Sequence, residues 1–348
     1  MDLRPTPEQE QLVATFAALF AKHATPEHVR AAEPRGFDPA LWEQLLDLGV
    51  VTMGVGEPAG GWGASLLDLA LVTEQLGRVV APAPVAEAQA AARLLERLPG
   101  DAAAATLASV VDDGRLVTLA LSRSTRMVPA AAVADAAIVP SEDALLLVPL
   151  GDGVATPVAN LGSMPVADLA ADAIVGPEVI VLARGPEAAA AHGAAVDDWL
   201  ALTAAALVGL GQRALEIGVA YVKERHAWGV PIGSFQAVAH RLADSATALD
   251  GAQLVAREAA WAATARPERH GELAAMAFGL AYEAARDASY RSLHFHGGYG
   301  FMMEYAIQLY YRRARAWATV FGGPTYHHRR IADKRYGPLP TASGSVVA

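Results

Sequence analysis

The chain has 348 residues, of which 53% are hydrophobic and 18% charged, and it carries a formal net charge of -10 and no cysteine. This composition excludes disulfides and thiolate metal sites, and the acidic balance makes nucleic acid a poor partner because its phosphates would repel the chain. No basic stretch followed by an apolar run opens the sequence, and charge or Gly breaks the apolar runs before about 18 residues. We therefore expect neither a signal peptide nor a membrane span, and a cytoplasmic protein.

Four segments of the first hundred residues repeat apolar residues at helical spacing, with Gly and Pro between them. These segments predict helices over roughly 6–24, 40–49, 65–80 and 85–98. Together they indicate an N-terminal helical domain over 1–112.

After about residue 113 the sequence pattern changes to short runs of β-branched residues or Leu, separated by Gly, Pro, Asp and Ser. The runs RLVTLALS, AAIVPS, ALLLVPL and VIVLAR predict strands. We expect a small, reduced β-domain over 113–186.

Long helical patterns return after residue 186 and indicate a C-terminal helical bundle over 187–336, followed by a flexible tail over 337–348. Frequent Ala permits close helix packing, and the large apolar fraction implies that many helices bury more than one face. Such a chain forms a large bundle or an oligomer. The predicted helices are roughly 187–225, 234–265, 269–296 and 303–319.

Three motifs carry a resemblance to the acyl-CoA dehydrogenase family. They are YVKERHAWGVPIGSFQAVAHRLAD (221–244), preceded by GLGQRALEIG, then LHFHGGYGFMMEY (293–305), and an N-terminal stretch that includes the Gly-Gly turn GEPAGGWGAS. The resemblance spans most of 5–335. It implies a mainly α fold with an N-terminal helical domain, a middle β-barrel and a C-terminal four-helix bundle, assembled as a dimer of dimers.

The resemblance also implies where a catalytic base should stand. Acyl-CoA α,β-dehydrogenation removes a proton from the α carbon while the β hydrogen leaves as hydride to FAD, so a carboxylate must lie near the α carbon. Matched to the family, the two possible positions of this Glu fall at Gly322 and Trp199. Neither is an acid, and no Asp or Glu occurs between Glu304 and Asp333. The sequence therefore predicts no catalytic residue in this chain.

Three other acids remain as alternatives for the base: Asp197, Asp198 and Glu304. Asp197 and Asp198 are one or two residues from Trp199, but each step along a helix turns a side chain by about 100°. Acids near a helix N-terminus also commonly interact with the helix dipole instead.

The chain matches the family's cofactor-binding residues better than it matches the catalytic base positions. By resemblance, Arg225, Trp228 and Gln236 match the residues on the pyrophosphate side, and His294, Gly297 and Gly298 match the adenine-side turn, with His294 in place of the usual Gln. Arg is a permanent cation for phosphate, and glycines let backbone approach a planar base. In the family this half of each FAD is bound across the dimer interface by the neighbouring subunit. The competing interpretation pairs Arg225 with Glu224 or Glu216.

Paired histidines raise the question of a metal site. His294 and His296 do not share a helix face, and no carboxylate completes a ligand set around them or around His327 and His328. We expect no metal.

The resemblance extends to the non-catalytic subunits of actinobacterial heterotetrameric (α2β2) acyl-CoA dehydrogenases acting on steroid side-chain CoA thioesters. It predicts a subunit that completes the shared FAD site of a homologous catalytic partner, in a complex that takes a bulky acyl-CoA and passes electrons to an electron-transfer flavoprotein. Two alternatives stay open. One is a self-sufficient homotetrameric dehydrogenase, and the other is a flavin-free scaffold or binding protein with this fold.

Overall fold

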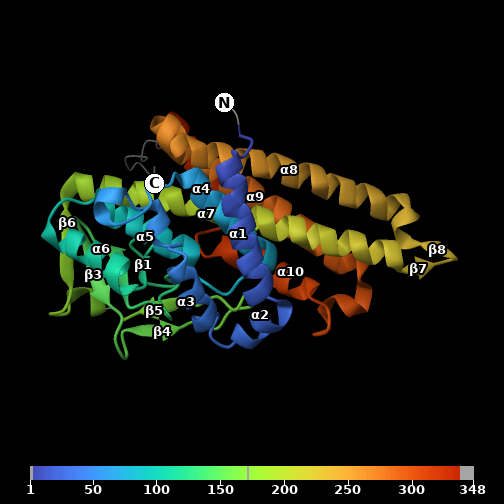
Figure 1. Cartoon of the computed structure of the whole chain (residues 1–348), viewed down its shortest axis with the longest axis horizontal. Helices are drawn as coiled ribbons and strands as arrows, with labels where there is room; N and C mark the ends of the chain where they lie inside the picture. Colours follow the sequence, from blue (N-terminus) through green and yellow to red (C-terminus); the bar gives the residue numbers. More distant parts are fainter. Residues whose placement is uncertain (1–2, 171, 338–348) are drawn as a thin grey trace, which may run out of the picture.

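A computed structural model describes residues 3–170 and 172–337 of the chain (Figure 1). The small β region lies at the lower left of the molecule in Figure 1, and the longest three helices, α7 (Gly185–Glu224), α8 (Gln236–Ala265) and α9 (Pro267–Phe295), run side by side across it. The predicted mainly α fold class is confirmed.

The N-terminal region consists of six α-helices with two short 3-10 turns. Two of these helices begin with reciprocal capping boxes, in which Thr6 pairs with Gln9 and Ser65 pairs with Asp68. Helices α2 and α6 were not predicted as separate elements. The elements are α1 (Pro7–His23), α2 (Pro26–Ala32), α3 (Pro39–Asp47), η1 (Thr52–Gly54), η2 (Glu57–Ala59), α4 (Leu66–Val79), α5 (Val85–Arg97) and α6 (Asp101–Asp113).

The β region lies between α6 and α7. Its main sheet has the order β1-β2-β3-β6, with β1 parallel to β2 and the other pairs antiparallel, and β4 pairs with β5 in a separate sheet. All four predicted strand runs appear in the main sheet, whose ladder does not close into a ring within the described residues. The strands are β1 (Val117–Leu119), β2 (Ala136–Pro140), β3 (Ala144–Pro149), β4 (Ala155–Pro157), β5 (Ala167–Leu169) and β6 (Ile180–Arg184), with η3 (Ala173–Val175) before β6.

The C-terminal region follows the predicted helices within a few residues. A hairpin separates α7 from α8 at the right-hand end of the molecule in Figure 1. The remaining elements are β7 (His226–Ala227), β8 (Val230–Pro231), η4 (Ile232–Ser234), η5 (Gly297–Phe301), α10 (Ile307–Thr319) and α11 (Pro324–Tyr336), of which α11 was not predicted. The predicted tail lies almost entirely outside the described residues.

Helix α7 forms the centre of the fold. Nearly every residue from Ala195 to Gly211 is buried, and α4, α5, α8, α9 and α10 all pack on this helix. Contrary to the sequence expectation, α7 is long and apolar enough to cross a membrane, but 89% of its most apolar window is buried inside the protein. It is therefore a core helix of a soluble fold.

Helices α4 and α7 cross at very short range. A Cβ added to Gly77 would lie 1.9 Å from the Ala206 carbonyl oxygen, and one added to Gly209 would lie 1.9 Å from the Glu74 carbonyl oxygen. Only glycine fits at both points, so this pair fixes how closely the N-terminal helices approach the C-terminal bundle.

Candidate functional site

A cavity of about 80 Å³ lies where the three regions of the chain meet. Its walls come from α4, the α4–α5 connection, α5, loops of the β region, α7 and α10. Trp199 from α7 and Trp317 from α10 contribute the largest side chains to this lining. We call it the junction cavity.

Trp199, one of the two positions at which the resemblance predicts a base, lies in the wall of the junction cavity. Its side chain is 1% exposed and contacts the rings of Phe278 and Phe321, with centroids 5.7 and 6.1 Å away. The indole N–H donates to Glu87 Oε1 at 3.0 Å. The indole is therefore fixed by packing on one side and by a hydrogen bond on the other.

Gly322, the second predicted base position, lies in the turn between α10 and α11. Its φ of +94° is in the left-handed region, and a Cβ there would come within 3.0 Å of the Tyr326 ring. The preceding residue, Phe321, makes the edge contact with Trp199 described above. The two positions are more than 120 residues apart in the sequence, yet the fold brings their neighbourhoods together beside the junction cavity.

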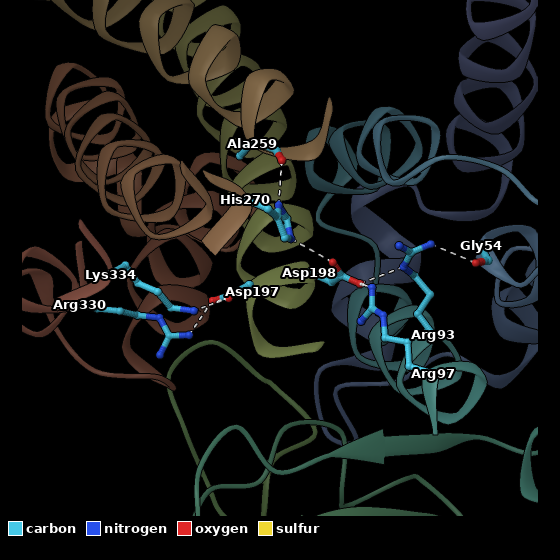
Figure 2. A network of polar contacts seen from close by, with 9 residues as sticks. All are labelled: Gly54, Arg93, Arg97, Asp197, Asp198, Ala259, His270, Arg330 and Lys334. Atoms are coloured by element: carbon cyan, nitrogen blue, oxygen red, sulfur yellow. Dashed lines mark hydrogen bonds and ion pairs between the residues drawn. The ribbon is translucent and has the colours of Figure 1, made fainter. Parts of the chain in front are cut away.

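Asp198 is held in a buried network that leaves neither carboxylate oxygen free (Figure 2). Oδ2 accepts from Arg93 Nε at 2.9 Å and from Arg97 Nη2 at 2.6 Å, both on α5, and Oδ1 contacts His270 Nε2 at 3.0 Å. His270 Nδ1 in turn lies 2.9 Å from the Ala259 carbonyl oxygen. Both ring nitrogens thus face oxygen acceptors.

These contacts make Asp198 a poor proton acceptor. Burial alone would raise the pKa of Asp198, but the hydrogen bond from His270 and the charges of Arg93 and Arg97 outweigh burial and hold it far below its ordinary value. A carboxyl with so low a pKa binds a proton weakly. Asp198 instead ties α7 to α5 and α9.

Asp197 points to a different element, as expected for the neighbouring position on a helix (Figure 2). Its two oxygens accept from Arg330 Nη2 and Lys334 Nζ on α11, each at 2.6 Å. The side chain is buried and fully partnered. Asp197 therefore anchors α11 on the bundle.

Glu304, the third alternative base, lies at the other end of the bundle. It is exposed, and its neighbour Tyr305 packs edge-on against Tyr221 near the end of α7. Tyr221 is 22 residues beyond Trp199 on the same helix, which corresponds to about 33 Å. The structure thus argues against all three alternative bases.

One carboxyl beside Trp199 was missed in the sequence. Glu87 lies in the first turn of α5, a common place for an acid, so nothing in the pattern marked it. In the structure Glu87 lines the junction cavity and has no cationic partner among the described residues. Burial raises the pKa of its carboxyl, against the smaller effect of the Trp199 hydrogen bond.

The six residues predicted to bind cofactor lie on segments at the hairpin end of the bundle (Figure 1). Tyr221 of α7 stacks on His296 at the end of α9, with ring centroids 3.9 Å apart, and so joins the hairpin side to the turn η5. Arg225 caps α7, Trp228 forms the hairpin tip and Gln236 opens α8. His294 ends α9, and Gly297 and Gly298 open η5.

The side chains at this end are open to solvent. Trp228 is 91% exposed and has a φ of +50°, and its ring is held edge-on to Phe235 at 5.9 Å. The predicted competing pairs of Arg225 are not seen: Arg225 forms no ion pair with Glu224 or Glu216 in the described structure, and Glu216 binds two other arginines, Arg78 and Arg213. The arrangement presents an unpaired cation beside an exposed ring.

A groove of about 440 Å³ runs between α8 and α9 beside His294. Arg241, Arg291 and Tyr290 line it, and the Tyr290 ring stacks on His294 with centroids 6.0 Å apart. Gly297 and Gly298 have no atom within 4 Å of an added Cβ, so the turn next to the groove is open. Asp287 also lines the groove and pairs with Arg291, and Arg241 pairs with Asp244, so both arginines already face a carboxylate. The stacked rings and the open backbone suit a nucleotide base.

Family models match both helical regions of the chain. The model of the acyl-CoA dehydrogenase N-terminal domain matches residues 6–100, and that of the C-terminal domain matches residues 201–337. Acyl-CoA dehydrogenase IpdE2 of Mycolicibacterium smegmatis is 32% identical over 327 residues, which cover 93% of this chain and 97% of the relative. This chain belongs to the acyl-CoA dehydrogenase family.

Other similar proteins extend the comparison. IpdE2 of Mycobacterium tuberculosis is 30% identical over 95% of this chain and 98% of its own length. One chain of the ChsE4–ChsE5 complex from Mycobacterium tuberculosis matches with a TM-score of 0.85 at 28% identity, covering 96% of this chain and 98% of that chain. A chain of the Tcur3481–Tcur3483 steroid acyl-CoA dehydrogenase matches with a TM-score of 0.83 at 28% identity, covering 94% and 97%.

Acyl-CoA dehydrogenases are FAD-dependent oxidoreductases acting on CH–CH bonds, so the two ends of this chain can be tested for fit to FAD. The hairpin end offers an arginine, Arg225, with no ion pair among the described residues, together with exposed aromatic rings and a groove of about 440 Å³, and this chemistry is compatible with a nucleotide phosphate and base. The junction cavity does not fit the flavin ring, because about 80 Å³ is far below the roughly 300–1,000 Å³ of pockets for molecules of that size.

The two ends are also separated along the central helix. Glu224 at the end of α7 follows Trp199 by 25 residues, or about 38 Å of helix. The hairpin end and the junction cavity are thus far apart along α7.

Proposed function

We propose that this chain is the non-catalytic subunit of a heterotetrameric (α2β2), FAD-dependent acyl-CoA dehydrogenase that desaturates a bulky acyl-CoA, with a steroid side chain as the leading candidate. The hairpin end would complete the FAD site of a homologous catalytic partner. The observation that carries the proposal is the contrast between this open, cationic end and the junction cavity, which Trp199 lines and which measures only about 80 Å³.

Each named residue has a physical role in the proposal. Arg225 would pair with the pyrophosphate, Trp228 and Gln236 would flank it, and His294 with Gly297 and Gly298 would contact the adenine side. When bound, FAD accepts the hydride from the β carbon. The partner would supply the carboxylate that takes the α proton, because neither Trp199 nor Gly322 has a carboxylate side chain.

The comparisons support a complex of two different subunits. One similar solved structure is named as the ChsE4–ChsE5 complex, and another joins two protein names, Tcur3481–Tcur3483, and is called a steroid acyl-CoA dehydrogenase. The acyl-CoA substrate, an electron-transfer flavoprotein as acceptor and a cytoplasmic location belong to the same proposal.

Two readouts on the same preparations test this function. The chain is expressed alone and together with a homologous subunit that carries the family Glu, and flavin per chain and acyl-CoA-dependent dye reduction are measured. We expect about one FAD per two chains and activity only in the co-expressed complex. Full flavin loading and activity of the isolated chain would establish the self-sufficient alternative. Absence of flavin from both preparations would establish the scaffold alternative.

A matched pair of variants locates the flavin contact. Arg225→Ala in the complex should lower the FAD content, because it removes the cation predicted for the pyrophosphate. Arg123→Ala removes an equally exposed arginine from the β region and should leave the FAD content unchanged. Equal flavin loss in both variants would contradict the assignment of the hairpin end.

A further inference from the structure

Two polar groups of the junction cavity have no assigned role, and both lie close to Trp199. Glu87 accepts from the Trp199 indole through Oε1 and lines the cavity. Thr203 stands one helical turn after Trp199 on α7 and lines the same cavity. Its side chain is 6% exposed, and its hydroxyl has no hydrogen-bond partner in the part of the chain that the structure describes.

An unpartnered buried hydroxyl is uncommon, because leaving such a group without a hydrogen bond costs about 1–3 kcal/mol. The neighbouring polar side chains do not satisfy it. The Thr73 hydroxyl donates to the Leu69 carbonyl at 3.0 Å, and Arg313 pairs with Glu33 at 3.2 Å. The hydroxyl of Thr203 therefore needs a hydrogen-bond partner that the described part of the chain does not supply.

The remaining lining is largely apolar and rich in Ala and Pro, with Leu76 and Met164. A cavity with such walls and few polar groups takes an apolar ligand and orients it through one or two hydrogen bonds. We propose that the junction cavity binds the oxygen-bearing end of an apolar ligand, a ketone or an alcohol, through the Glu87 carboxyl and the Thr203 hydroxyl.

The charge state of Glu87 selects between possible ligand oxygens. Burial raises the pKa of this carboxyl and favours its neutral form, which can donate an O–H. A ketone or alcohol oxygen accepts that bond. A ligand carboxylate would instead be placed in an apolar cavity where the nearest cation, Arg313, is already neutralised by Glu33.

The size of the cavity limits what enters. About 80 Å³ is roughly half of the 150 Å³ that holds one benzene molecule in an engineered cavity. A group of four or five heavy atoms fits, either as a free small molecule or as the end of a longer acyl chain. The proposal requires neither flavin nor a partner chain, so it can fail or hold independently of the proposed function.

The test measures binding to the full-length chain by ligand-observed NMR, with butanone, 2-butanol and butanoate as free probes. Two thioesters, 4-oxopentanoyl-CoA and pentanoyl-CoA, test the acyl-chain source, because the first ends in the same methyl ketone as butanone. We expect saturable binding of butanone and 2-butanol at pH 7 and no saturable binding of butanoate. Tighter binding of 4-oxopentanoyl-CoA than of pentanoyl-CoA identifies an acyl-chain source, and equal binding of the two with butanone bound identifies a free ligand.

Variants assign the binding to the two residues. Glu87→Leu should weaken ketone binding about tenfold, the value of one hydrogen bond to a buried group, and Thr203→Val should weaken it severalfold. Glu87→Gln should keep most of the affinity because the amide also donates, and it guards against a variant that merely misfolds. Glu43→Leu, at an exposed position of α3, should have no effect.

Three results would overturn the proposal. They are butanoate binding as tightly as butanone, unchanged ketone affinity in Glu87→Leu, and no saturable binding of either butanone or 4-oxopentanoyl-CoA. The last would show that the cavity holds water alone.

Discussion

The substitution Asp198→Asn tests the buried network between α5, α7 and α9. It keeps the shape of the side chain and removes the charge that faces Arg93, Arg97 and His270. Removing one partner of a buried ion pair costs about 3–5 kcal/mol. Because the Arg93 and Arg97 side chains keep 17% and 29% exposure, water offsets part of this loss, and we expect about 3 kcal/mol.

The assay is urea unfolding followed by circular dichroism, where the midpoint should fall while the slope stays unchanged. Asp143→Asn is the control, since its pair with Arg184 joins side chains that are 71% and 62% exposed, and it should change the unfolding free energy by less than about 1 kcal/mol. A loss of unfolding free energy below about 1 kcal/mol in Asp198→Asn would refute the view that this network holds α5, α7 and α9 together.

The same network predicts a dependence on pH. The folded state lowers the pKa of Asp198, so its contribution to stability is complete above the unfolded value of about 3.9 and is lost as pH falls toward the folded value. Unfolding free energies measured between pH 5 and pH 2.5 should therefore fall more steeply in the wild type than in Asp198→Asn. Parallel curves would contradict this.

Three further substitutions address other parts of the molecule. Trp228→Ala should change stability by no more than about 0.5 kcal/mol, because the ring is exposed, yet should lower FAD retention in the co-purified complex; unchanged retention would exclude its role. Burial lowers the pKa of His327 to about 4, so falling pH should destabilise the wild type by up to about 1.4 kcal/mol per pH unit between pH 6.5 and 4. Urea midpoints of His327→Phe should not show this part of the pH dependence. Gly209→Ala should cost about 1–3 kcal/mol or more because the new methyl meets the Glu74 carbonyl, whereas Gly251→Ala, which has free space in α8, should stabilise slightly in the same unfolding assay.

The long helices could be predicted because apolar periodicity persists over many turns. The predicted segment 234–265 and the observed α8 differ by two residues at one end, and α7 and α9 are similarly close. Helix α6 was missed because it follows Pro99-Gly100 and its Ala-rich start carries little contrast between faces. The predicted strands appeared in place, but how they pair depends on contacts far apart in the sequence.

Some residues of the candidate site could also be predicted from the sequence, and others could not. The hairpin-end residues could be predicted as a cofactor site because two contiguous motifs, 221–244 and 293–305, contain them, and the structure places them on neighbouring segments. Glu87 could not be found, because its role depends on Trp199, which approaches it from a helix more than 100 residues away. Asp197 and Asp198 looked like candidate bases in the sequence because their partners on α5, α9 and α11 lie between 72 and 133 residues away.

Helix α7 connects the buried aspartates, Trp199 and the hairpin through one unbroken run of backbone hydrogen bonds. In such a helix each residue adds a fixed rise along the axis and a fixed rotation about it. Inserting one residue after Gly211 would shift the hairpin by about 1.5 Å and turn it by about 100° relative to the core, whereas a seven-residue insertion would nearly restore the phase and displace it by about 10 Å. The register of one helix thus sets the direction in which Arg225 and Trp228 face relative to the core.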